Sequence, residues 1–368
     1  MSIAEVQAGL LRVPLTQPVR NGTATITERE YVFVRIMTDS GVWGEACCLA
    51  RGGDLVSIIR RTLAPLTVGR GEHEPQRITA DAWARCRPFL GTDGQVARAV
   101  SVVDMALWDL HAKSAKLPLA ELLGAGGIER VPVMAASGYY TSLDPVVELA
   151  AIEREFAELA EQGYSKLKIM AGAVDASFDA ERIAAAVSAA NMSVGVDVNG
   201  AWRSTGDAQR LLGAVPSGAI EFIEEPFPLG EIDVLRRFRR FESTPVAIGE
   251  WETDARYLRT LMEEGLVDLL RLDVTAIGGV TGWLVASALA TSFAIPVLPH
   301  YFPFFHAPLL AATPTSLAVE VVPVSSGAEN FQLLLRSVPP IDNGFLSLSP
   351  DAGFGLDWDW DAIETFTQ

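Results

Sequence analysis

Val194-Gly195-Val196-Asp197 and Ile220-Glu221-Phe222-Ile223-Glu224 are two short apolar runs that each end on a carboxylic acid. A longer amphipathic stretch separates them, as a helix would. The same alternation continues through the second half of the chain. Eight such runs follow one another, at 131–136, 166–170, 194–198, 220–224, 246–249, 269–273, 296–300 and 317–322. Alternating strands and helices form parallel sheets, and eight units in about 200 residues favour a closed (β/α) barrel.

The residues before the barrel show a different order, with strands first and helices afterwards. Residues 31–36 are rich in β-formers, and Asp39-Ser40-Gly41 supplies the turn of a hairpin, with 3–13 as a third strand. From Leu55 to about Lys116 the apolar residues follow a helical period. This segregation predicts a separate α+β domain.

Glycines at the end of this helical region place the domain boundary near Ile128. We therefore expect an α+β domain at 1–128, the barrel at 129–329 and a terminal segment at 330–368. The terminal segment has no place left in the barrel, so we expect it to pack back on the N-terminal domain. Trp358 and Trp360 could equally belong to an interface.

Composition excludes several classes of protein. With 29 Lys and Arg against 46 Asp and Glu, the net charge of −17 opposes binding to nucleic acid or to an anionic membrane. The three cysteines lack disulfide or zinc-site spacing, and the first residues do not resemble a secretory signal, so we expect a cytoplasmic protein. The uncharged stretch 274–319 is broken by Gly and Pro, which argues against a membrane span.

Polar residues mark the carboxyl end of every predicted strand from the second onward. In chain order they are Lys166 and Lys168, Asp197 and Asn199, Glu224, Glu250, Asp273, His300 and Glu320. Buried charges are costly unless they pair or bind a metal, and barrel enzymes build their active sites at this face. The pattern therefore predicts an active site that combines all these strands.

Three of these residues form a candidate metal site. Asp197, Glu224 and Glu250 end three consecutive strands, which are neighbours in a barrel. Their charges would repel unless a hard cation lay between them, and Mg²⁺ is the usual choice for oxygen ligands. Each acid alone could be a simple strand-end or capping residue. Asn199 shares a strand face with Asp197 and could contact the ligand bound at the metal.

Candidate bases flank this site. Lys166 and Lys168 share one strand face, where each would lower the pKa of the other and leave one neutral. His300 would be made a stronger base by Asp273 on the preceding strand. Apolar neighbours would raise the pKa of Glu320 and keep it protonated as a hydrogen-bond donor, unless it is a salt-bridged strand end.

These residues resemble those of the enolase superfamily, and within it the mandelate racemase subgroup. The resemblance rests on Lys166-Leu167-Lys168, Asp197-Val198-Asn199, Ile223-Glu224-Glu225-Pro226, Gly249-Glu250, Asp273, Ile277-Gly278-Gly279-Val280-Thr281-Gly282-Trp283 and His300. It implies a modified (β/α)₇β barrel whose N-terminal capping domain closes the substrate pocket, and, by analogy only, a homo-oligomer.

The resemblance also implies roles for the marked residues. Asp197, Glu224 and Glu250 would bind Mg²⁺, with Glu224 rather than Glu225 as the ligand. Bases on the two substrate faces would be Lys168 and the pair of His300 with Asp273. Lys166 would help electrostatically, and Glu320 would donate a hydrogen bond to the enediolate formed when the proton α to a carboxylate is removed.

The reaction and the substrate stay open at this stage. Two bases permit racemisation or epimerisation, and the conjugate acid of His300 could instead expel a β-hydroxyl. A polar loop expected at 14–27, which includes Arg20, suits a hydroxylated acid, whereas Trp251 and Tyr301 suit an aromatic one. We favour a sugar-acid dehydratase acting on a small carboxylate. The alternatives are a racemase, epimerase or lactone cycloisomerase, and, in another class, a non-catalytic binding protein that retains the metal site.

Overall fold

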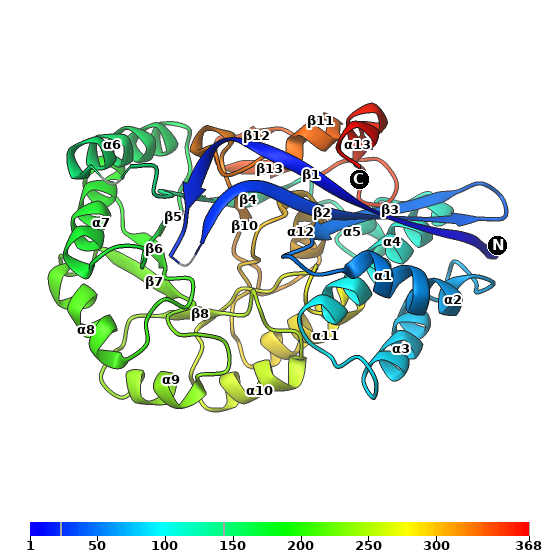
Figure 1. Ribbon diagram of the computed structural model, residues 1–368, viewed down its shortest axis with the longest axis horizontal. Helices are drawn as coiled ribbons and strands as arrows, with labels where there is room; N and C mark the ends of the chain where they lie inside the picture. The colour runs from blue at the N-terminus through cyan, green and yellow to red at the C-terminus, as the bar shows by residue number, and fades with distance from the viewer. Residues whose placement is uncertain (23, 143, 368) are drawn as a thin grey trace.

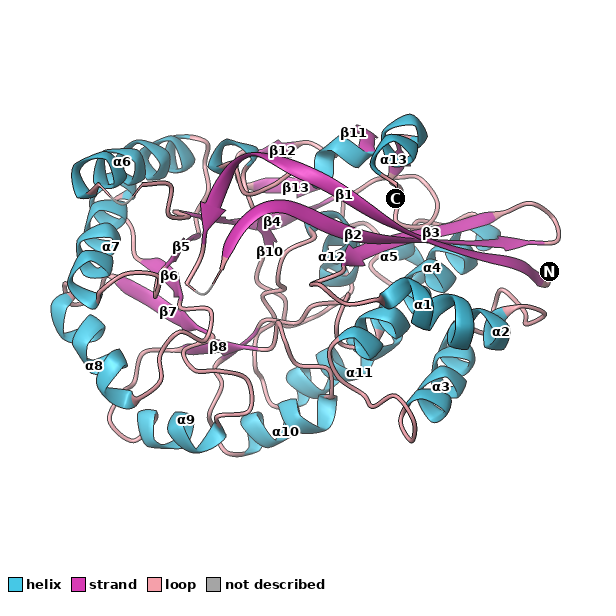
Figure 2. Ribbon diagram, viewed as in Figure 1, coloured by secondary structure: helices cyan, strands magenta, loops and turns pink. Residues whose placement is uncertain are grey.

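A computed structural model describes residues 1–22, 24–142 and 144–367 (Figure 1). Its N-terminal part begins with an antiparallel sheet in the order β1-β2-β3. The strands are β1 (Ile3–Arg20), β2 (Thr25–Thr38) and β3 (Trp43–Leu49). The expected loop at 14–27 is wrong, because both strands continue through it and Val19 pairs with Ile26. A long hairpin, rather than a loop, therefore reaches the barrel (Figure 2).

Helices cover one face of this sheet. They are α1 (Leu55–Ile58), a π-helical turn (Ile59–Leu63), α2 (Ala64–Thr67), α3 (Pro75–Cys86), α4 (Gln95–Ala115) and α5 (Leu119–Leu122). The longest, α4, packs closely on β3 at Gly44, where a Cβ would collide with the carbonyl of Ala106. The predicted order of strands followed by helices is confirmed. Cys47, Cys48 and Cys86 are buried and unpaired in this domain.

The second part is the predicted barrel. Its strands are β4 (Arg130–Ser137), β5 (Leu167–Met170), β6 (Val194–Asp197), β7 (Ile220–Glu224), β8 (Val246–Ile248), β9 (Leu269–Leu270) and β10 (Val319–Val321). β4 to β9 run parallel in sequence order, and β10 closes back on β4. Single bridges join Val297 to Leu270 and Ser316, so the segment around 297 takes the place of a strand between β9 and β10 and brings the barrel wall to eight segments. All eight predicted runs therefore lie in the barrel wall.

The barrel helices surround this wall (Figure 2). They are α6 (Pro145–Glu161), α7 (Ala176–Ala190), α8 (Thr205–Ala214), α9 (Ile232–Phe238), α10 (Ala255–Glu263), α11 (Gly279–Ser292) and α12 (Pro303–Ala311). Inside the wall, an apolar layer of Met134, Phe222, Ala247, Leu298 and Ala318 fills the barrel below the strand ends. Polar chemistry is thus left to the carboxyl end. Within the described residues, no helix is long and apolar enough to cross a bilayer.

The terminal segment contacts both parts. After two 3₁₀ turns (Val324–Ser326 and Phe331–Leu334), it contains β11 (Leu335–Ser337), β12 (Ile341–Asp342), β13 (Phe345–Ser347), β14 (Asp357–Trp358) and α13 (Trp360–Phe366). Trp358 and Trp360 lie edge-on to Phe33 of the cap, with ring centroids 4.8 and 5.5 Å away. β13 pairs antiparallel with β4, a contact the sequence did not indicate. The exact division at Ile128 stays a prediction.

A buried carboxyl group joins the cap to the barrel. Asp104 of α4 accepts hydrogen bonds from the Thr79 hydroxyl (2.6 Å) and from the Thr281 backbone N–H (2.9 Å) of α11. Gly279, with a φ of 73°, gives it room, because a Cβ there would collide with the Asp104 carboxyl group. Burial raises the pKa of Asp104 from 3.8 to about 7 despite these hydrogen bonds.

This shift predicts a pH-dependent contribution to stability. The folded protein holds the Asp104 proton more tightly than the unfolded chain does. The contribution of this proton to the free energy of unfolding is therefore complete below pH about 4 and is lost as the pH rises through about 7. Relative to the wild type, Asp104→Asn is expected to gain stability between pH 4 and 8, by up to about 1.4 kcal/mol per unit of pKa shift. Urea unfolding at both pH values measures this gain, and a difference independent of pH would contradict it.

Candidate active site

The cavity of interest lies between the carboxyl ends of the barrel strands and the tip of the β1–β2 hairpin. Backbone hydrogen bonds in both directions between Arg20 and Tyr140 (3.1 and 2.9 Å) fix the hairpin over the barrel mouth. The lining residues come from both domains: Asn21, Ile26, Arg29, Leu49, Arg51, Tyr139, Lys168, Met170, Asp197, Asn199, Glu250, His300, Tyr301 and Glu320. The predicted meeting of strand-end residues is therefore observed for most of them.

The three predicted metal ligands converge. One carboxylate oxygen each from Asp197, Glu224 and Glu250 lies within 4.8 Å of the others, and all three residues are buried. Glu224 Oε2 and Glu250 Oε2 have no hydrogen-bond partner among the described residues. Glu225 points elsewhere and accepts a hydrogen bond from the Gly249 N–H at 2.8 Å. The free oxygen atoms fit a cation ligand set that uses Glu224 rather than Glu225.

Electrostatics also favour a cation at this place. Burial, followed by the charge of Glu224, raises the pKa of Asp197 to about 6 although Lys168 opposes the shift. Burial and the charges of Asp197 and Glu224 raise the pKa of Glu250 well above its ordinary value. A divalent cation would remove this repulsion, and carboxylate oxygens are ligands that Mg²⁺ accepts.

His300 and Asp273 form the predicted pair. His300 Nδ1 lies 3.1 Å from Asp273 Oδ2, while Asp273 Oδ1 accepts from the Thr275 N–H and hydroxyl at 2.8 and 2.7 Å. His300 Nε2 lies 3.3 Å from Glu250 Oε2, beside the three acids. Burial lowers the pKa of His300 below its ordinary value, which leaves the imidazole neutral and able to accept a proton.

Arg98, a residue that the sequence analysis missed, supports this pair from the cap. It belongs to α4, and its Nη1 lies 3.3 Å from the Thr275 hydroxyl and 3.9 Å from Asp273 Oδ2. Burial alone would raise the pKa of Asp273, but His300 and Arg98 hold it below its ordinary value. A cation in a mostly apolar helix segment, 96–103, was the available signal.

Removal of this cap residue has an expected effect. Arg98→Met should lower kcat about 10-fold to 100-fold, the usual cost of losing a group that orients a reacting residue. Arg98→Lys should recover part of the loss because it restores the charge near Asp273. Steady-state kinetics on the two variants measure this, and equal losses in both would contradict a role through charge.

Lys168 has a different environment from the one we expected. Its Nζ lies 3.0 Å from Asp197 Oδ2, 2.8 Å from Glu224 Oε1 and 2.7 Å from Glu320 Oε2. Burial lowers its pKa, but these carboxylates together raise it well above the ordinary value. The expectation that a neighbouring lysine leaves Lys168 neutral is wrong in this structure.

Lys166 is not part of the cavity. It precedes β5 and pairs with Glu221, near the start of β7, so this ion pair lies toward the amino ends of the strands. Two residues of a strand span roughly 6.6 Å, which separates Lys166 from Lys168 and from the site. The expectation that Lys166 helps electrostatically in the site is therefore corrected, since its side chain pairs with Glu221 outside the cavity.

Glu320 is salt-bridged rather than surrounded only by apolar groups. It contacts Lys168 and Arg271, and its Oε1 accepts from the Tyr301 N–H at 3.0 Å. Burial raises its pKa, but Arg271 and Lys168 lower it below the ordinary value. The prediction of a neutral Glu320 is wrong because it considered only the flanking apolar residues, and the salt-bridged alternative describes the observed contacts. Arg271 could have been found, since it shares a strand face with Asp273.

The predicted substrate-binding residues divide into two groups. Asn199 and Tyr301 line the cavity, and Asn199 Oδ1 accepts from Asn21 Nδ2 of the hairpin at 3.0 Å. Arg20 is exposed, and neither Arg20 nor Trp251 is among the described lining residues. Asn21, which directly follows the end of β1 at Arg20, contacts the site instead.

Two cap arginines were missed. Arg29 is buried, and its Nε and Nη2 donate to the Ala328 carbonyl at 3.2 and 2.8 Å. Arg51 is exposed at the mouth of the cavity. They lie far from the barrel in sequence, and only the folded cap brings them to it.

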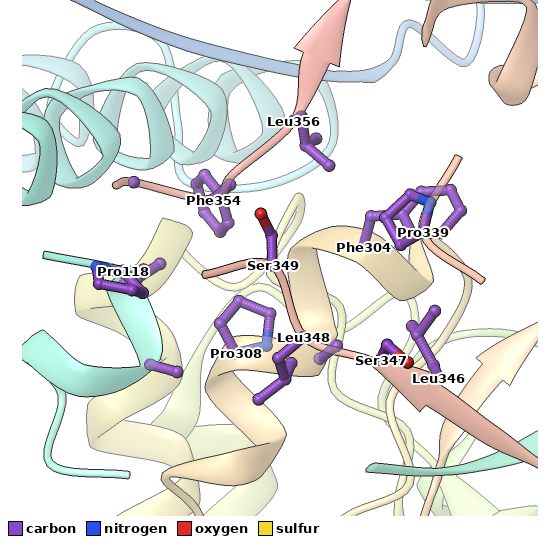
Figure 3. Close-up of a pocket in the computed structure, with 14 residues that line it drawn as sticks. Pro118, Phe304, Pro308, Pro339, Leu346, Ser347, Leu348, Ser349, Phe354 and Leu356 are labelled. Carbon is purple, nitrogen blue, oxygen red and sulfur yellow. The ribbon is translucent and has the colours of Figure 1, made fainter. Parts of the chain in front are cut away.

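A second pocket lies between the two domains and the terminal segment (Figure 3). Proline, leucine and aromatic residues line most of it, including Pro118, Phe304, Pro308, Phe354 and Leu356. Its described lining residues include no acid, base or histidine. It therefore offers no group for proton transfer.

A barrel whose strand ends hold three convergent carboxylates and a histidine, closed by an α+β cap, has the architecture of a metal-dependent enzyme. Two family models match the chain. Residues 5–124 match the N-terminal domain of mandelate racemase and muconate lactonizing enzymes, and residues 151–362 match the enolase C-terminal domain. This protein belongs to the mandelate racemase/muconate lactonizing enzyme family of the enolase superfamily.

Individual relatives agree with this membership. D-gluconate dehydratase of Thermoproteus tenax is 33% identical over 78% of this chain, which spans only 60% of that relative. The crystal structure of a mandelate racemase/muconate lactonizing enzyme-like protein from Rubrobacter xylanophilus has a TM-score of 0.89, at 27% identity over the whole of both chains. A family member from a marine actinobacterium, in complex with magnesium, has a TM-score of 0.85 at 28% identity, over 100% of this chain and 99% of its own.

Other relatives carry the names of several reactions. Most are dehydratases of sugar acids, and the others include two cycloisomerases and one epimerase. Substrate and outcome vary among them.

Proposed function

We propose that this protein is a Mg²⁺-dependent dehydratase of a sugar acid. The observation that carries the proposal is the position of His300 Nε2, which faces the cavity beside Asp197, Glu224 and Glu250 and is oriented by Asp273. A neutral imidazole at this place can remove a proton and then return it to a leaving group.

A magnesium ion held by Asp197, Glu224 and Glu250 would supply positive charge for the substrate carboxylate, which makes the α-proton more acidic. His300 Nε2 takes that proton, and Asp273 stabilises the imidazolium through Nδ1. The electron pair of the broken C–H bond then forms a double bond to the β-carbon as the β-hydroxyl leaves. His300 gives its proton to this hydroxyl, so that water departs and the remaining enol becomes a 2-keto-3-deoxy acid.

The lining of the cavity supports a hydroxylated substrate. Asn21, Asn199 and Tyr139 offer hydrogen bonds, while Arg29 and Arg51 add positive charge near the hairpin. Such groups fit a substrate that carries several hydroxyls better than they fit an aromatic substrate. The sugar-acid dehydratases among the relatives point to the same substrate class.

Racemisation, epimerisation or cycloisomerisation is the second candidate, favoured by relatives with those names. Lys168 lines the cavity and is the residue that would serve as a second base. A non-catalytic binding protein is the alternative from another class.

A substrate screen tests the proposed function. The protein is incubated with Mg²⁺ and a library of mono- and diacid sugars in D₂O, and 2-keto acids and α-deuterium are measured by NMR. We expect loss of water from at least one acid, and inhibition by EDTA. Deuterium exchange without loss of water from any acid would favour the isomerase, and no exchange with any acid would favour the binding protein.

A further inference from the structure

The residue of β5 that faces the cavity at the level of the metal ligands is a methionine. Met170 pairs in register with Asp197, and Asp197 in turn pairs with Glu224. Lys168 pairs with Gly195, one step deeper in the barrel. Met170 lines the cavity, and its sulfur lies 3.8 Å from Asn199 Nδ2. A thioether cannot accept a proton near neutral pH.

Lys168 lies below this level and is fully engaged. Its three N–H donors face three carboxylates, those of Asp197, Glu224 and Glu320, and the residue is 1% exposed. Lys168 therefore forms ion pairs that hold two of the metal ligands and Glu320 together. It leaves no direction in which the ammonium nitrogen could approach a substrate carbon above the metal ligands.

The remaining lining groups offer no replacement. Glu320 is held by Lys168 and Arg271, and Asp197 and Glu250 belong to the metal site. Burial raises the pKa of Tyr139 to about 12, so its phenol stays protonated. His300 is the one lining residue, among those described, with a ring nitrogen suited to accept a proton.

Met170 and His300 lie on different sides of the cavity. β5 and the His300 segment are separated by β10 and β4 on one side and by β6 to β9 on the other. A substrate carbon between them therefore presents one face to an imidazole and the other to an apolar side chain.

We propose that this site works with a single base, His300, and that Met170 closes the opposite face of the substrate against proton transfer. The proposal rests on the proposed function and narrows it. The protein eliminates water from acids of one configuration at C2, and it does not interconvert C2 epimers. When no β-hydroxyl is present, the proton that His300 removes exchanges with solvent. In D₂O the imidazolium then gives a deuteron to the same face of the α-carbon, so the configuration is retained.

The test uses the 3-deoxy analogue of an acid that the wild type dehydrates, because this analogue cannot lose a β-hydroxyl. Both C2 epimers are incubated with the protein and Mg²⁺ in D₂O, and α-deuterium and configuration are followed by NMR. We expect the wild type to exchange the α-hydrogen of one epimer with retention. His300→Asn should lower this exchange at least 100-fold.

A gain of activity is the sharper result. Met170→Lys places an amine level with Asp197 and is expected to bring exchange of the other epimer and interconversion of the two. Lys166→Met is the matched control. It alters a lysine that precedes β5 and pairs with Glu221 outside the cavity, so the exchange of the one epimer should be unchanged.

Interconversion of the epimers by the wild type would overturn the proposal, as would exchange that persists in His300→Asn. Both results would leave the metal-dependent chemistry in place. Absence of exchange and of water loss with every acid would instead overturn the proposed function itself, so the two failures are distinguishable.

Discussion

Substitution of His300 by asparagine is expected to lower kcat for water loss by about 1,000-fold or more. General base catalysis contributes about 100-fold to 10,000-fold, and here the same nitrogen takes the α-proton and protonates the leaving hydroxyl. Asparagine keeps a polar group next to Asp273 but cannot accept a proton. Formation of the 2-keto acid under saturating substrate measures the loss.

His73→Asn is the matched control, because His73 is exposed on the cap and is not among the residues that line the cavity. It should leave kcat unchanged. A His300→Asn variant that retains a tenth of the wild-type kcat would show that another group removes the proton.

Substitution of Glu250 by glutamine is expected to have opposite effects on activity and on stability. Loss of one ligand should lower kcat by about 1,000-fold, since a bound metal stabilises developing charge by several kcal/mol. Without metal, however, burial and the neighbouring acids raise the pKa of Glu250 well above its ordinary value. A neutral amide relieves this repulsion, so the Tm measured in EDTA should rise.

Glu221→Gln is the control for this second prediction. Glu221 belongs to β7, like Glu224, but pairs with Lys166 away from the cavity. It should change neither kcat nor the response of Tm to EDTA. A fall in the Tm of Glu250→Gln in EDTA would show that Glu250 stabilises the metal-free protein, contrary to the argument from repulsion.

Much of the barrel could be predicted from the sequence because its signals are local. A strand buried on both faces reads as a short apolar run, and a charge at the end of such a run stands out. Asp197, Glu224 and Glu250 were found in this way, and their convergence followed from strand order alone. His300 and Asp273 were paired by the same reasoning.

The charge states could not be predicted, because they depend on contacts across the barrel. The surroundings of Glu320 appeared apolar from its own strand, but Lys168 and Arg271 reach its carboxylate from other strands. Likewise the depth of Lys168 depends on the register of β5, which one residue of slip would change. Arg98 and Asn21 reach the site from the cap, so their contacts there depend on how the two domains dock.

Manganese binding tests the central claim most directly, since Mn²⁺ prefers the same oxygen ligands as Mg²⁺ and can be counted by electron paramagnetic resonance. Titration of the wild type and of a variant with Asp197, Glu224 and Glu250 all replaced by their amides gives the number of ions bound per chain. The account predicts one tightly bound ion for the wild type, displaced by Mg²⁺, and none for the variant. Equal binding by both proteins, or no tight binding by the wild type, would contradict it.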